Sequence, residues 1–255
     1  MNDKSETRLA EAPTPRQQDG LFKVLDVIHR FREPVRLVYQ NDGSIDLSPP
    51  DRLDANAPQK AAGILPPLYP EWLGDRGFAE THNCRFPYMV GEMARGITTA
   101  NMVIACARAG LMSFFGSAGL SWRAIEEAVG QIQRTLGPDI AHWGATLLHS
   151  PNEPGQEDAV VDLFLRLGVQ RMSASAFMSL TPAIIRYAAS GLRQDPDGTV
   201  HRHNHVFAKI SRPEVAALFL SPPPANMLDN LVQSGHLTTN QADLAAHLPI
   251  AEDIT

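Results

Sequence analysis

From residue 85 onward, short apolar runs alternate strictly with helical patterns, and this alternation limits the folds open to the chain. The apolar runs cover residues 86–90, 111–115, 144–149, 171–175 and 206–210. The helical patterns between and after them cover residues 99–109, 121–136, 157–167, 181–190 and 212–220. Each helix must pack back on the sheet, so we expect parallel strands joined by right-handed crossovers.

Local signals support these helix boundaries. Ser121 stands where an N-cap is expected, and the apolar residues after it recur every three or four positions, as on the buried face of a helix. Glycines stand where helix C-caps are expected, at Gly110, Gly137, Gly168 and Gly191. The chain is therefore predicted to be an α/β protein.

Two further helical patterns follow, over residues 225–233 and 238–248, and the last letters, "PIAEDIT", read as the opening of a sixth strand. A complete (β/α)8 barrel takes about 250 residues for its eight units. Residues 85–255 are too few for that. The pattern predicts either an open sheet or a TIM (β/α)8-type barrel truncated to about five βα units.

The region before residue 85 differs in composition. Residues 1–20 are polar and are predicted to be a disordered tail. Residues 21–84 are predicted to hold a helix over residues 21–31, a hairpin and a Pro-rich connector. The hairpin strands, "PVRLVYQ" and "SIDLS", flank the turn sequence "NDG". Residues 85–255 then form the partial barrel domain.

Composition narrows the partners and the compartment. The formal net charge is −6, which argues against binding to nucleic acid. No apolar run approaches the roughly 20 residues that cross a membrane, and the first residues do not resemble a secretory signal. There are two cysteines, of which Cys106 is expected to be buried and Cys84 could be exposed. A reduced, cytoplasmic protein without a metal site is the expectation.

Small residues follow the first two apolar runs of the barrel, where bound molecules lie in α/β proteins. The first of these loops, "GEMARG", contains Gly91, Met93 and Ala94, and the second is "FGSAG". Small residues let backbone amides approach a flat ring closely, although a tight turn with a packed methionine explains the first loop equally well. The second loop lacks a recognised phosphate-binding pattern.

Three basic or titratable features remain open to two interpretations. His149 follows the third strand and is either an acid or base or an ordinary loop residue. The run "HRHNH" over residues 201–205 suggests a metal cluster, but it lies on the amino-terminal side of the sheet, which favours a solvated loop. Lys209 ends an apolar strand, so it either faces solvent or is held by an anion.

Four segments taken in order resemble the PfaD-type enoyl reductases, which act in trans in polyunsaturated fatty acid synthases and polyketide synthases. They are "LGDRGFAETHNCRFPYMVGEMARGITTANMVIACARAGLMSFFGSAGLS", "WGATLLHSPNEP", "SASAFMSLTPAIIRYAASGL" and "FAKISRPEVAALFLSPPP". The resemblance runs from about Pro70 to Thr255. More distantly, the sequence is similar to nitronate monooxygenases and to flavin-dependent enoyl reductases of the same barrel type.

The resemblance implies an FMN-binding barrel that uses NADPH to reduce enoyl thioesters carried on acyl carrier protein, within a polyketide or fatty acid synthase complex. Gly91, Met93 and Ala94 match the loop beside the flavin ring, where small residues would make room for it. Thr146 falls where related barrels often have an asparagine that contacts the cofactor. Lys209 matches a strand lysine that contacts the flavin in nitronate monooxygenases, and we expect its side chain on the inner face with Thr146 and Met93.

The resemblance also implies parts that follow Thr255 in related proteins, namely a Gly-Gly-His loop with the catalytic histidine and the FMN phosphate loops. The catalytic residue is therefore left unassigned, with His149 as the local substitute. The chain alone is expected to be inactive, and uncovered inner strand faces are expected to make it self-associate. The alternatives are a nitronate monooxygenase-like flavin oxidase and a non-catalytic half-barrel that docks on a synthase.

Overall fold

The computed structural model describes residues 15–48, 61–153 and 155–255, and it divides the chain into two compact units, Met1–Leu73 and Gly74–Thr255. The sequence places this boundary later, between residues 84 and 85. The difference arises because α2 (Arg76–His82) packs against the strands of the second unit. Most of the predicted tail, residues 1–14, lies outside the described residues, but α1 already begins at Pro15.

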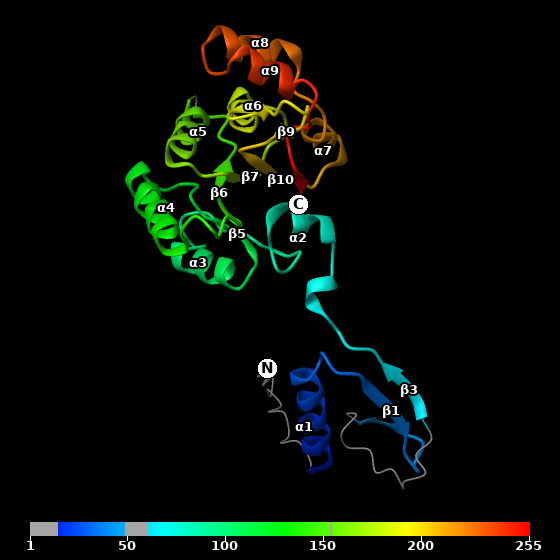
Figure 1. The fold of residues 1–255 in the computed structure, drawn as a ribbon. Helices are drawn as coiled ribbons and strands as arrows, with labels where there is room; N and C mark the ends of the chain where they lie inside the picture. The colour runs from blue at the N-terminus through cyan, green and yellow to red at the C-terminus, as the bar shows by residue number, and fades with distance from the viewer. Residues whose placement is uncertain (1–14, 49–60, 154) are drawn as a thin grey trace, which may run out of the picture. The chain divides into compact units, whose positions relative to one another are not determined.

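The first unit contains one helix and a small antiparallel sheet of order β2-β1-β3 (Figure 1). Its elements are α1 (Pro15–His29), β1 (Val35–Tyr39), β2 (Ile45–Ser48), β3 (Ala61–Leu65) and the 3-10 turn η2 (Pro70–Trp72). The predicted hairpin is confirmed, with Gly43 at a φ of 79° in its turn. The third strand, β3, lies in the predicted Pro-rich connector and pairs with β1 through a bulge.

The second unit is built on a six-stranded parallel sheet of order β11-β10-β7-β6-β5-β4 (Figure 1). Its strands are β4 (Met89–Val90), β5 (Met112–Phe115), β6 (Trp143–Leu148), β7 (Arg171–Ser175), β10 (His205–Lys209) and β11 (Asp253–Ile254). The predicted strand order along the chain is confirmed, including the sixth strand.

Helices follow the strands as the sequence predicts. They are α3 (Ala100–Arg108), α4 (Trp122–Leu136), α5 (Gln156–Leu167), α6 (Pro182–Ala189), α7 (Pro213–Phe219), α8 (Ala225–Gln233) and α9 (Thr239–Ala245). The Ser121 side chain accepts a hydrogen bond from the Ala124 amide, which confirms the predicted N-cap. Among the described residues, no helix has the length and apolar character to cross a bilayer.

A short antiparallel pair lies where the sequence predicts only loop. It consists of β8 (Arg193–Gln194) and β9 (Val200–His201), joined by a turn that contains Gly198. The turn closes with a hydrogen bond from the Asp195 amide to the Thr199 carbonyl. Strands of two residues carry no periodic signal, so the sequence could not reveal them.

The two faces of the parallel sheet bury different side chains. The outward face packs against the helices in one apolar cluster, to which the strands contribute Phe115, Ala145, Leu147, Met172, Ala174, Val206 and Ala208. The helices contribute fully buried residues to the same cluster, among them Val129, Phe164 and Ile184. Because successive strand residues point to opposite faces, the intervening residues line the inner face.

Part of the inner face is covered by α2, contrary to the expectation that the inner faces are exposed. Phe114 and Phe207 are fully buried there, with ring centroids 5.0 Å apart. Phe78 and His82 of α2 place their rings 6.2 and 4.8 Å from that of Phe207. Aromatic side chains bury a large area each, so this contact holds α2 on the sheet.

The exposures expected for the two cysteines are wrong. Cys84 is buried beside the inner-face aromatic cluster, whereas Cys106 on α3 is only partly buried. Burial raises the pKa of the Cys84 thiol to about 11, so the thiol stays protonated and unreactive near neutral pH. Burial of Cys106 was expected because the helical run around it is apolar on more than one face. Exposure of Cys84 was considered because α2, which covers the inner-face cluster beside it, was not predicted.

An ionic cluster attaches β11 to its neighbours. The His82 Nε2 atom lies 2.8 Å from an oxygen of Asp253. Glu252 Oε2 lies 3.2 Å from His205 Nδ1 and 3.2 Å from Arg202 Nε. The hydrogen bond from His205, followed by the charges around it, holds the pKa of the Glu252 carboxyl below its usual range. The ionised carboxylate therefore stabilises this edge of the sheet.

We predict that Glu252→Gln reduces stability at neutral pH and removes part of its acid dependence. A lowered folded-state pKa contributes stability above the unfolded-state value, and that contribution is lost as the pH falls through the folded pKa. The free energy of unfolding in urea, measured between about pH 7 and about pH 3, should separate the two proteins most at neutral pH and least in acid. A constant difference across that range would contradict the assignment.

Candidate functional site

The carboxyl ends of the strands bring polar side chains together on the inner face. In the strand register, Ser173 of β7 lies opposite Thr146 of β6, and Ser175 lies opposite Lys209 of β10. Side chains at paired positions of neighbouring strands point to the same face. Thr146 and Lys209 therefore share the inner face, as predicted. Met93 lies in the loop after β4 with 44% of its surface exposed, so the strand register does not assign it to that face.

A buried carboxylate, Glu92, organises this inner-face cluster. Its Oε1 atom accepts hydrogen bonds of 2.8 Å from both Ser173 Oγ and Ser175 Oγ. Lys209 Nζ lies 3.6 Å from the same oxygen, with about half of the lysine side chain exposed. The glutamate side chain is only 3% exposed, and its Oε2 atom is buried without a hydrogen-bond partner among the described residues. One carboxylate oxygen thus remains available to a donor.

Glu92 was not predicted as a site residue. The signal that could have found it is Lys209, because a lysine at the end of an apolar strand needs a nearby anion. Glu92 follows Gly91 in the first of the two loops that were singled out for their small residues. Spacing along the chain gives no indication of the contact, since Glu92 follows β4 and Lys209 ends β10, and these strands are not neighbours in the sheet.

The small residues after β5 make room for the protein chain itself. A Cβ atom on Gly116 would lie 1.8 Å from the carbonyl oxygen of Met93. The amide of Gly96 donates to the carbonyl of Gly116, and that of Arg95 to the carbonyl of Ala118. The expectation that small residues after both strands make room for a bound molecule is therefore wrong at Gly116. A Cβ on Gly91, in contrast, would meet nothing within 4 Å, which leaves this position open to a ligand.

His149 is held in a defined orientation. Its Nδ1 atom lies 2.7 Å from Oε1 of Glu157, and its ring packs 4.8 Å from that of Phe177. Glu157 in turn accepts hydrogen bonds from the Ser150 amide and from Thr181 Oγ1. With Nδ1 directed at a carboxylate, Nε2 is the nitrogen left to exchange a proton. An oriented imidazole of this kind suits an acid or base better than an ordinary loop histidine does.

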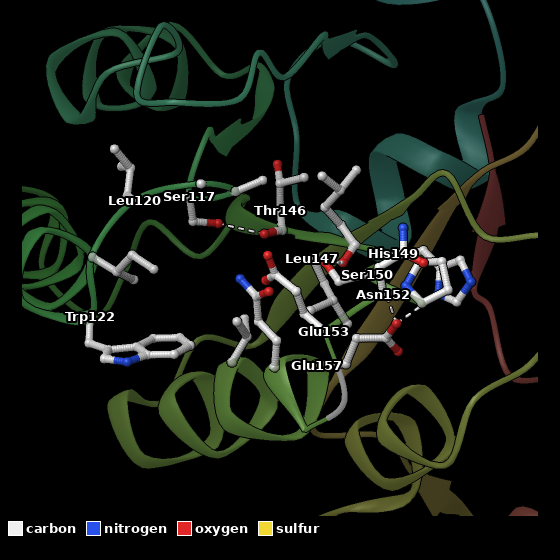
Figure 2. Close-up of a pocket in the computed structure, with 17 residues that line it drawn as sticks. Ser117, Leu120, Trp122, Thr146, Leu147, His149, Ser150, Asn152, Glu153 and Glu157 are labelled. Carbon is white, nitrogen blue, oxygen red and sulfur yellow. Dashed lines mark hydrogen bonds and ion pairs between the residues drawn. The ribbon is translucent and has the colours of Figure 1, made fainter.

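A pocket of about 320 Å³ opens between the loops after β5 and β6. Figure 2 shows Trp122 and Leu120 toward one end, His149 and Asn152 toward the other, and Thr146 between them. Ser117 Oγ donates to the carbonyl of Thr146 and so joins the two loops. The Oγ1 atom of Thr146 is buried without a hydrogen-bond partner among the described residues. The pocket therefore reaches a residue of the inner face.

Two of the three histidines in residues 201–205 have side-chain partners. His201 lies 2.6 Å from Asp195, and His205 pairs with Glu252. The side chain of Asn204 is buried and donates to the carbonyls of Tyr187 and Ser190. Within the ranges that the structure describes, no three His, Cys, Asp or Glu side chains are grouped as metal ligands. These contacts explain the positions of His201 and His205 as structural.

The amino-acid sequence is similar to proteins of polyunsaturated fatty acid and polyketide synthesis. No family model matches the chain. It is 42% identical over 195 residues to one of the polyunsaturated fatty acid synthase subunits of Thraustochytrium sp., covering 76% of this chain and 13% of that protein. It is also 42% identical over 184 residues to the polyketide biosynthesis protein PksE of Bacillus subtilis, covering 72% of this chain and 24% of that protein.

The fold is also similar to that of a solved enoyl reductase domain. The enoyl reductase domain of MlnA, from the macrolactin biosynthesis cluster of Bacillus amyloliquefaciens, is 40% identical and superposes with a TM-score of 0.69. The chain is homologous to this domain. The match covers 71% of this chain and 41% of that one, so the chain spans less than half of it and under a quarter of the two biosynthetic proteins. The resemblance to PfaD-type enoyl reductases and the TIM-barrel type of fold are confirmed.

We predict that Gly116→Ala destabilises the fold by about 2–3 kcal/mol, because its Cβ would collide with the backbone of the loop after β4. Gly91→Ala is the matched control, since a Cβ there meets open space and the backbone is not left-handed. Its effect should stay within about 0.5 kcal/mol. Unfolding in urea measures both variants. Equal stability of the two would show that the loops do not make this contact.

Proposed function

We propose that the chain serves in an FMN-dependent enoyl reductase that acts in polyketide or polyunsaturated fatty acid synthesis. Its substrate would be an enoyl thioester carried on acyl carrier protein, and its reductant NADPH. The homology to the MlnA enoyl reductase domain carries this proposal. The polar cluster at the carboxyl ends of the strands supports it, because TIM barrels do their chemistry at that end.

The residues present are compatible with a flavin at the inner-face cluster. Gly91 leaves its side-chain space open, so a flat ring can approach the backbone there. Thr146 has a buried hydroxyl oxygen without a partner among the described residues, which suits the polar edge of such a ring. Lys209 carries a half-exposed ammonium group. We propose these three residues, with Met93 and Ala94 of the same loop as Gly91, as the cofactor contacts.

FMN, when bound, would supply hydride transfer between NADPH and the β-carbon of the enoyl thioester. The side chains of this chain would orient the reactants and balance charge. The Glu92 carboxylate and the hydroxyls of Ser173 and Ser175 fix Lys209 at the cluster, and its ammonium group can stabilise negative charge that develops nearby. Holding the partners in register is the larger contribution of the protein.

His149 is the proposed proton donor within this chain. The Glu157 carboxylate lies 2.7 Å from His149 Nδ1 and orients the imidazole, and the Phe177 ring packs against it. A proton on Nε2 can then be delivered to the α-carbon of the thioester, which completes the reduction. Glu157 acts as the positioning residue because its contacts with Ser150 and Thr181 hold it in place.

The activity is tested by supplying the purified chain with FMN and following NADPH oxidation in the presence of crotonyl thioester. Because the chain spans only 41% of the MlnA chain, we expect it alone to hold FMN weakly and to leave the enoyl group unreduced, and stoichiometric flavin with turnover would contradict that expectation. Parallel assays contain a nitroalkane and oxygen in place of the thioester. Turnover confined to the nitroalkane would favour a nitronate monooxygenase-like oxidase. Binding to acyl carrier protein without flavin would favour a non-catalytic docking role.

We predict that Lys209→Ala weakens FMN binding by about ten-fold, the usual effect of losing one charge-assisted contact. The readout is flavin fluorescence, which does not depend on turnover. Lys23→Ala is the control, because Lys23 pairs with Asp46 in the first unit. Gly91→Ala should also weaken binding while leaving stability unchanged. Wild-type affinity in both site variants would rule out the proposed cofactor contacts.

In a protein that contains the whole enoyl reductase domain, we also predict that His149→Gln slows product formation while NADPH-dependent flavin reduction keeps its rate, since the imidazole acts only on the thioester. Stopped-flow absorbance separates the two half-reactions. Glu157→Gln should slow the same half-reaction, because the amide no longer holds the His149 ring through the 2.7 Å contact with Nδ1. If both half-reactions slow equally, His149 is a structural residue.

A further inference from the structure

Strand β7 ends in a backbone conformation that alanine rarely adopts. Ala176 directly follows Ser175, the last residue of the strand, and has a φ of 65°. In this left-handed region the Cβ atom of an L-residue crowds the neighbouring carbonyl oxygen, whereas glycine adopts it freely. Such strain persists only where the surrounding contacts impose it, so the contacts on either side of Ala176 explain its conformation.

The residues on the two sides of Ala176 point to opposite faces of the sheet. In an extended strand, residues two apart point to the same face. Ser175 lies on the inner face, where its Oγ donates a 2.8 Å hydrogen bond to Oε1 of Glu92. Phe177 is 2% exposed and belongs to the apolar cluster on the outer face. The backbone must therefore reverse between them, and the left-handed Ala176 provides the reversal.

The reversal places Phe177 against His149. The centroids of their rings lie 4.8 Å apart, with the ring planes at 35°. Phe177 is supported by the ring of Phe219 on α7, at 6.2 Å. The amide of His149 also donates to the carbonyl of Ser175 at 3.0 Å. Both neighbours of Ala176 therefore contact His149, one through the backbone and the other through its ring.

The same loop also contacts the carboxylate beside the imidazole. Thr181, at the end of the loop, donates from Oγ1 to Oε2 of Glu157 at 2.8 Å. The other carboxylate oxygen of Glu157 lies 2.7 Å from Nδ1 of His149. Residues 176–181 thus hold the imidazole on its face through Phe177 and at one nitrogen through Glu157. A ring that is held in both ways keeps one orientation.

We infer that Ala176 is a positioning residue for His149. Its left-handed backbone fixes Phe177, and Phe177 fixes the plane of the imidazole. Because Ser175 binds Glu92 at the same point of the chain, the end of β7 also sets the distance between His149 and the inner-face cluster. Alanine restricts this loop where glycine would leave it free to move. The inference rests on the proposed function for the role of His149, but its main test requires neither flavin nor substrate.

Nuclear magnetic resonance of the chain, labelled with carbon-13 at histidine Cε1, tests the inference. The His149 resonance is identified by its absence in His149→Gln, and Phe177→Leu shows how far the neighbouring ring shifts it. We expect Ala176→Gly to broaden this resonance or move it toward its position in Phe177→Leu. Since the strain is relieved, the midpoint temperature of unfolding should rise by about 2–4 °C.

Asn83→Gly is the matched control. Asn83 also has a left-handed backbone, with a φ of 54°, but it ends α2 and has no printed contact with His149. The change to glycine there should leave the His149 resonance in place. An unchanged resonance in Ala176→Gly, an equal change in Asn83→Gly, or a lower midpoint temperature for Ala176→Gly would each overturn the inference.

A kinetic measurement separates this inference from the proposed function. In a protein that contains the whole enoyl reductase domain, Ala176→Gly should slow the product-forming half-reaction about five-fold and leave flavin reduction and FMN affinity unchanged. A displaced His149 resonance with an unchanged product-forming rate would support the positioning role and refute His149 as the proton donor. A slower rate with the resonance in place would refute the positioning role.

Discussion

The carboxylate of Glu92 joins three strands at the carboxyl end of the sheet. It comes from the loop after β4, takes hydrogen bonds from two serines of β7, and lies within ion-pair distance of Lys209 on β10. A buried charge is tolerated only when donors surround it, so these side chains must be arranged together. The position of Lys209, and hence of the charge that a ligand would meet, depends on that arrangement.

Because side chains alternate along each strand, the two faces of the sheet carry different kinds of side chain. Outward residues pack against α3 to α7 in the large apolar cluster, and inward residues divide into an aromatic part under α2 and a polar part at the carboxyl ends. A substitution on the outer face therefore affects packing, whereas one at the polar end is expected to affect the proposed cofactor site first. Thr146 links the polar part to the pocket beside it, because it lies on the inner face and also lines that pocket.

The sequence predicted the regular part of the fold because each strand and helix carries its own period and end signals. It did not predict α2 or β3, whose roles come from contacts with distant residues such as Phe207 and Val35. The same limit applies to the site. Lys209 and Thr146 were predicted on one face from alternation, but Glu92 and the His149–Glu157 pair are recognised only from folded contacts.

The glycines show why pattern alone misassigned part of the site. Gly91 and Gly116 occur in similar surroundings, each directly after an apolar strand. In the structure, Gly116 is required by the backbone of a neighbouring loop, while Gly91 has nothing within 4 Å of its missing side chain. A small residue can serve either the chain or a ligand, and only the space beyond it distinguishes the two. That space is found at Gly91, in the same loop as Glu92, which is why the proposed ligand surface is assigned to the place where the loop after β4 meets the inner face.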